Sequence, residues 1–105
     1  MTTAIVFVEH ADGTPRRASL ECVGAAVAAG ATVVAVLTGA GAEGAAAAVT
    51  GASEAVILTG GDGYSPDAFS AACAELIKAR SAKAFFAAST YRGKDLAPRV
   101  AARLD

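Results

Sequence analysis

The part of this sequence best suited to chemistry lies near its C-terminal end, where residues 89–94 (STYRGK) follow an apolar run. Hydroxyl groups, a glycine and two cations gather there, and the N–H groups of a following helix would join them. This combination is typical of a loop that holds a phosphate or another anion. We therefore predict a candidate anion-binding loop formed by Ser89, Thr90, Arg92, Gly93 and Lys94.

Two other interpretations of this basic segment stay open. Its charges can form a face for a partner subunit, or they can belong to a capped helix whose charges are solvated. Pro98 limits where that helix starts, because proline inside a helix removes a hydrogen bond and clashes with the preceding turn. We predict Asp95 as the N-cap, which makes Pro98 the third helical residue.

A second phosphate-binding motif is weaker. Residues 39–44 match G-x-G-x-x-G after a predicted strand and before a predicted helix. However, the motif follows the second strand rather than the first, and Glu43 would place a carboxylate beside the anion. A chain rich in Gly and Ala also matches this pattern by chance, so we prefer residues 89–94.

The remaining reactive side chains are isolated. His10 has no Ser or Cys partner at a recognisable spacing, so we assign it no chemistry. Cys22 and Cys73 lack metal or redox spacing and are expected to be reduced core residues. We therefore predict no catalytic residue and no metal site.

Composition indicates one folded domain over residues 1–105. Hydrophobic residues make up 54% of the 105, which excludes a disordered chain. No apolar stretch reaches the length of a membrane span, and the first residues do not resemble a signal peptide. We expect a soluble protein of the cytoplasm, or of the mitochondrial matrix in a eukaryote, with no membrane insertion and no nucleic-acid partner; the cytoplasm is favoured.

Charge is distributed unevenly along the chain. Residues 1–77 contain two basic and eight acidic side chains, whereas residues 78–105 contain seven basic and two acidic ones. This asymmetry favours either an anionic partner at the C-terminal end or neutralisation between the two faces of the domain.

Apolar runs predict four buried strands, over residues 4–8, 32–37, 55–58 and 84–88. Helical segments separate them, and the first is predicted to begin with Thr14 as N-cap and Pro15 as its first residue and to end at Gly30. The resulting βαβαβαβα order predicts a Rossmann-like three-layer α/β/α sandwich. We expect one four-stranded parallel sheet with strand order 3-2-1-4, whose ligands approach the carboxyl ends of the strands.

Both ends of the chain resemble one family. Residues 5–10 (IVFVEH), 18–21 (ASLE) and above all 89–104 (STYRGKDLAPRVAARL) are similar to the N-terminal domain of the electron transfer flavoprotein α subunit. The likeness covers nearly the whole chain, and the last segment is its specific part.

This resemblance implies an α/β fold that packs against a β subunit in a heterodimer carrying one FAD. The family takes electrons from dehydrogenases and passes them to an acceptor, and a C-terminal domain of the α subunit holds most of the FAD. No FAD-contact motif of the family matches a position here, so no flavin-binding or redox residue is carried over. The segment 89–104 would then serve structure and the subunit interface rather than catalysis.

The resemblance also implies that family members continue beyond residue 105 through another strand and a flavin domain. We therefore expect a fragment that lacks the C-terminal FAD-binding domain, binds no FAD alone and is not an enzyme. The predicted strand over residues 84–88 would then be an open edge, through which we expect self-association. The alternative is a free-standing nucleotide-binding module that resembles universal stress or adenine-nucleotide-binding domains and uses residues 89–93 for phosphate.

Overall fold

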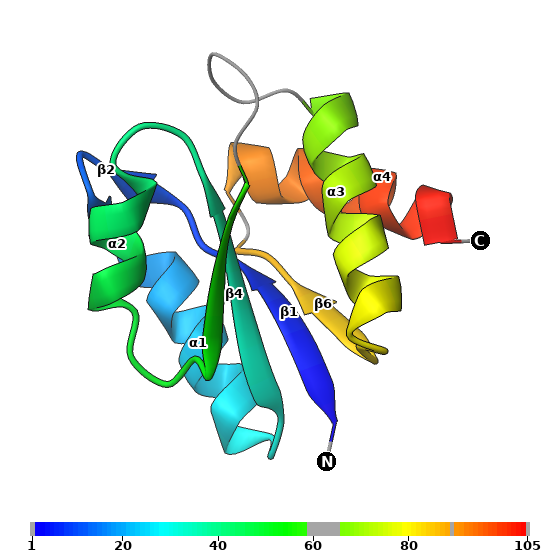
Figure 1. Ribbon diagram of the computed structural model, residues 1–105, viewed down its shortest axis with the longest axis horizontal. Coiled ribbons are helices and arrows are strands. Elements are labelled where there is room, and N and C mark those ends of the chain that lie inside the picture. The colour runs from blue at the N-terminus through cyan, green and yellow to red at the C-terminus, as the bar shows by residue number, and fades with distance from the viewer. Residues whose placement is uncertain (1, 59–65, 89, 105) are drawn as a thin grey trace.

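The computed structural model describes residues 2–58, 66–88 and 90–104. Strands and helices alternate along these residues (Figure 1). The main elements are β1 (Thr3–Phe7), α1 (Arg17–Ala28), β4 (Thr32–Thr38), α2 (Ala42–Ala48), β5 (Glu54–Leu58), α3 (Pro66–Ala79), β6 (Ala84–Phe86) and α4 (Tyr91–Leu104). A small antiparallel pair, β2 (His10–Ala11) and β3 (Thr14–Pro15), lies between β1 and α1.

One parallel sheet forms the middle layer of the domain. Its strand order is β5-β4-β1-β6, which confirms the predicted order 3-2-1-4. Ile5 in β1 lies opposite Val34 of β4 on one side and Phe85 of β6 on the other. Because β1 has a partner on both sides, its backbone groups are used by two ladders.

Helices cover both faces of the sheet, α1 and α2 on one face and α3 and α4 on the other (Figure 1). Successive side chains of a strand point to opposite faces. Val6 and Val8 accordingly pack in the α1/α2 core, and Ile5 and Phe7 pack in the α3/α4 core. The continuous apolar runs in the sequence reflect this double burial, and each fully buried side chain of this kind contributes about 1.5–3 kcal/mol.

The start of α1 differs from the prediction. Thr14 and Pro15 form β3 of a tight hairpin, and α1 begins only at Arg17. The hairpin turns at Asp12 and Gly13, whose φ angles are 50° and 80°. An Asp-Gly pair is favoured in two-residue hairpin turns, which need positive φ at both positions. The predicted end at Gly30 is confirmed, because Gly30 has a φ of 87° and donates its N–H to the Val27 carbonyl.

The described parts of the chain contain no helix that is both long and apolar enough to cross a membrane.

Strand β6 pairs with β1 and is the last strand of the described sheet on that side, as predicted. Self-association through its open side stays a prediction. Sedimentation velocity of the purified chain from low to high micromolar concentration tests it, and the expected result is a shift toward dimer mass. A single monomeric species throughout that range would contradict the prediction.

Candidate functional site

The candidate site lies where the carboxyl ends of β1 and β6 meet. Strands β4 and β5 lie on one side of β1, and β6, which comes later in the chain, lies on the other side of β1. Ligands of open α/β sheets approach at such a reversal of strand order. The segment after β1 carries Glu9 and His10, and the segment after β6 leads into the first turn of α4 with Thr90 and Arg92.

Glu9 is held in place from three sides. Its backbone N–H donates to the Ser19 hydroxyl at 2.9 Å, and its carbonyl accepts the Arg16 N–H at 2.8 Å. Its carboxylate accepts a hydrogen bond from the Thr90 hydroxyl, 81 positions later in the chain. Glu9 is only 8% exposed, so this hydrogen bond supports a carboxylate that has lost most of its water.

Thr90 also caps helix α4. Its hydroxyl oxygen accepts the Gly93 N–H at 3.1 Å, three residues into the helix, and its carbonyl accepts the Lys94 N–H. The prediction that Asp95 is the N-cap is therefore wrong. Helix α4 begins at Tyr91, more than one turn before the predicted start, and contains Pro98 in its interior. The Thr90 cap and the buried side chains of Leu96 and Val100 outweigh the hydrogen bond that Pro98 removes.

Gly93 is required at its position by packing. A Cβ atom there would lie 1.9 Å from the Ala88 carbonyl oxygen and 3.0 Å from the Ala88 carbonyl carbon. Both atoms belong to the backbone and cannot rotate away. The first turn of α4 therefore lies directly on the end of the segment that follows β6, and only glycine fits there.

The predicted anion-binding residues thus have different environments. Ser89 lies outside the described residues. Thr90 and Gly93 are joined in the helix cap, whereas the side chains of Arg92 and Lys94 are exposed. Anion binding by this loop stays a prediction. Two of the donors on which it was based are already used, the Thr90 hydroxyl by the Glu9 carboxylate and the Gly93 N–H by the cap.

Two adjoining cavities open beside these residues. One of about 240 Å³ is lined by the ends of β1 and β4 together with Arg92. The other, of about 440 Å³, is lined by Glu9, His10, Arg16, Thr90 and Arg92. Because Glu9, His10 and Arg92 line both, we treat the cavities as one cleft, called the β1–α4 cleft below.

The sequence patterns assign no chemistry to His10, Glu9 or Arg16. His10 Nε2 lies 2.8 Å from the Thr38 carbonyl oxygen. A carbonyl oxygen can only accept, so Nε2 carries the hydrogen. The Nδ1 atom is buried and has no hydrogen-bond partner among the described residues. Glu9 and His10 directly follow the first strand. This position in the sequence indicates residues of the ligand-binding edge, because the segments after the strands line that edge in such sheets.

The G-x-G-x-x-G motif serves a turn. Gly41 precedes α2 with a φ of 85°, and a Cβ atom there would lie 2.9 Å from the Gly13 nitrogen in the hairpin. The glycine thus allows the hairpin to contact the start of α2. That helix has only seven residues and carries Glu43 in its first turn, which disfavours an anion there.

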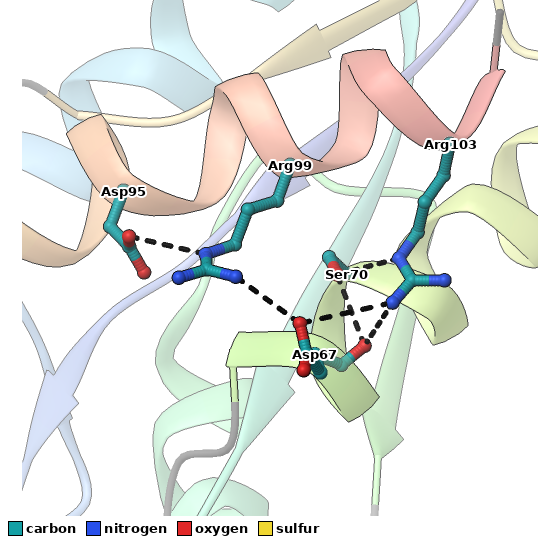
Figure 2. Close-up of polar contacts among 5 residues, drawn as sticks. All are labelled: Asp67, Ser70, Asp95, Arg99 and Arg103. Carbon is teal, nitrogen blue, oxygen red and sulfur yellow. Dashed lines mark hydrogen bonds and ion pairs between the residues drawn. The ribbon is translucent and has the colours of Figure 1, made fainter.

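Arg99 and Arg103 bind α4 to α3 (Figure 2). Arg99 contacts the carboxylates of Asp67 and Asp95, each at 3.2 Å. Arg103 donates to the Ser70 hydroxyl at 2.9 Å and to the Asp67 carbonyl at 3.2 Å. Asp67 lies in the first turn of α3, where a carboxylate also interacts well with the helix dipole. Arg99 and Arg103 of segment 89–104 therefore have partners within the domain.

The two cysteines are structural. Burial raises the pKa of the Cys73 thiol to about 12. Partial burial, and next the charge of Glu21, raise the pKa of Cys22. The described residues also contain no cluster of His, Cys, Asp and Glu side chains that could hold a metal ion.

We expect Cys73 in the folded protein to resist alkylation by iodoacetamide at about pH 8, since the thiolate is the reacting form. A pKa above the working pH keeps the thiol protonated, and burial blocks access. Intact-mass spectrometry before and after unfolding in denaturant measures this. Rapid addition of two alkyl groups to the native protein would contradict it.

Comparison with known proteins points to a family. A search of curated proteins finds no match for this chain. The family model of the electron transfer flavoprotein domain matches residues 4–105, which includes the sheet apart from Thr3, the Glu9–Thr90 contact and the α3–α4 ion pairs. The chain therefore belongs to the electron transfer flavoprotein domain family.

Proposed function

We propose that this chain is an N-terminal domain of the α-subunit type, a scaffold that packs against the β subunit of an electron transfer flavoprotein. The family match supports an electron-carrier role. In this proposal the complete carrier takes electrons from dehydrogenases through an FAD that another domain holds. The domain itself supplies structure and an interface and has no catalytic step.

The observation that carries this proposal is the position of Glu9. In a nucleotide-binding sheet, phosphate lies at a helix N-terminus where the strand order reverses. Here the buried Glu9 carboxylate lies beside the N-terminus of α4 and binds the cap residue Thr90. A second anion at that place would meet like charge, and the Gly93 N–H is already used.

The described residues therefore do not fit the pyrophosphate of FAD. The other glycine-rich segment leads into a short helix with Glu43 in its first turn. Each of these helix starts has a carboxylate beside it, Glu9 at α4 and Glu43 at α2, and that negative charge disfavours a dinucleotide phosphate. This favours the scaffold over the alternative of a free-standing adenine-nucleotide-binding module.

The test combines two measurements on the purified chain. Titration with FAD and with AMP, followed by backbone amide shifts, is expected to give no saturable change at Thr90–Gly93. Sedimentation of the chain mixed with an electron transfer flavoprotein β subunit is expected to show a complex. A stoichiometric flavin absorbance band, or saturable AMP shifts at those amides, would overturn the proposal in favour of the nucleotide-binding module.

A further inference from the structure

An internal carboxylate occupies the place where sheets of this kind hold the anion of a ligand. That place is a helix N-terminus at the reversal of strand order. Helix α4 begins there, and the hydroxyl of its cap residue Thr90 donates to the carboxylate of Glu9. Glu9 is buried, so this negative charge lies inside the domain. The chain therefore supplies for itself the charge that a phosphate would bring.

The position of Glu9 is fixed by contacts with two helix starts. Its backbone N–H donates to the hydroxyl of Ser19, which is fully buried, and its carbonyl accepts the Arg16 N–H. Ser19 lies in the first turn of α1, and Arg16 is the N-cap of that helix. Backbone contacts with α1 and a side-chain contact with α4 thus hold Glu9, so its carboxylate is a fixed part of the β1–α4 cleft.

Lack of space does not exclude an anion next to Glu9. The larger cavity of the β1–α4 cleft has a volume of about 440 Å³, and Glu9 and Thr90 both line it. One water molecule accounts for about 30 Å³ of liquid volume, so a tetrahedral oxyanion is small enough for this cavity. The obstacle is electrostatic, because two negative charges a few ångströms apart repel each other, and more strongly away from bulk water.

We propose that Glu9 is the residue that decides ligand specificity at this end of the sheet, an internal anion that takes up the Thr90 hydroxyl and excludes phosphate groups. Without the carboxylate, that hydroxyl can donate to an oxyanion while its oxygen still accepts the Gly93 N–H, because a hydroxyl has one donor and two acceptor sites. The inference rests on the proposed function in one respect, which is that the unmodified domain binds no nucleotide.

The test is a gain of anion binding in Glu9→Ala, with inorganic sulfate as the probe. Backbone amide shifts of the purified chain report where sulfate binds and give its dissociation constant. The unmodified chain should show no saturable shifts at Thr90 and Gly93. Glu9→Ala should show them, with binding at least about tenfold tighter than the limit set by the unmodified chain, since a nearby like charge is gone. Equal responses of the two chains would overturn the proposal.

Two further variants test whether position and hydroxyl both matter. Glu43→Ala is the matched control, because it removes the same charge from the first turn of the other helix start, α2; it should gain no sulfate binding. The double variant Glu9→Ala/Thr90→Val should lose the gain, because the hydroxyl that would donate to sulfate is missing. A gain in Glu43→Ala as large as that in Glu9→Ala would show a general effect of net charge, and undiminished binding by the double variant would exclude Thr90 as the donor; either result would overturn the proposal.

Amide spectra of each variant confirm folding. If Glu9→Ala does not fold, Glu9→Gln decides, because it keeps the shape of the side chain and removes only the charge; it should bind sulfate about threefold or more tightly than the unmodified chain. No gain in Glu9→Gln would then overturn the proposal. Sedimentation with the β subunit is a separate measurement. Failure of the sulfate gain leaves the scaffold proposal standing, and a chain that does not bind the β subunit removes the scaffold function but not the role of Glu9.

Discussion

Gly93→Ala is expected to destabilise the domain by at least about 3 kcal/mol, the upper range for an overpacked site between rigid groups. The added methyl group would lie 1.9 Å from the Ala88 carbonyl oxygen, so α4 must move away from the sheet. This displacement would also pull Thr90 from Glu9. Urea denaturation followed by circular dichroism measures the change in the free energy of unfolding.

Gly24→Ala is the matched control. Gly24 lies inside helix α1, and a Cβ atom there meets nothing within 4 Å. The same chemical change should therefore stabilise the domain by about 0.5–1 kcal/mol through helix propensity. If Gly93→Ala is as well tolerated as Gly24→Ala, the close contact between α4 and Ala88 is wrong.

Thr90→Val is expected to cost about 2–4 kcal/mol, the sum of a lost helix cap and of a buried carboxylate left without its donor. Valine has nearly the same shape as threonine, so packing changes little. Thr90→Ser keeps the hydroxyl and should lose much less. The free energies of unfolding of both variants, measured in urea, test this.

A double-mutant cycle with Glu9→Gln then isolates the contact. The cost of Thr90→Val should shrink in the Glu9→Gln background, since the neutral amide is less costly to leave unpaired. Strict additivity of the two changes would show that Thr90 acts only as a helix cap.

The sheet was predictable because its signals are local. Runs of buried apolar residues mark strands that are covered on both faces, and right-handed crossovers restrict how such strands can be ordered. The observed order β5-β4-β1-β6 is one of the few orders that these two constraints allow.

Both wrong helix starts arose where one short pattern fits two structures. Thr14-Pro15 suits a helix start, but it also follows Asp12-Gly13, which is a strong hairpin signal. Asp95 is a good N-cap by local rules. Thr90 prevails because its hydroxyl also reaches Glu9, a contact with a distant residue that no local rule detects.

The candidate site was only partly predictable for the same reason. The first turn of α4 was identified from its residue types, and Arg92 does line a cleft. His10 and Arg16 line the same cleft because the β2–β3 hairpin brings them together. The Arg16 N–H donates a hydrogen bond to the Glu9 carbonyl at the base of this hairpin. Their contribution depends on tertiary structure and not on a spacing in the sequence.

The pairing of β6 with β1 has a consequence for the order in which the domain assembles during synthesis. Strand β4 can pair with β1 early, because the opposite residues Thr3 and Thr32 are close in the sequence. Strand β6 can pair only later, because Ala84, which lies opposite Ala4, is synthesised much later. The Glu9 carboxylate can meet Thr90 only after the start of α4 has left the ribosome. Until then β1 has an unpaired side, and Glu9 stays in water. Burial of that carboxylate therefore requires closing a loop of about eighty residues, at an entropy cost that grows only slowly with the length of the loop.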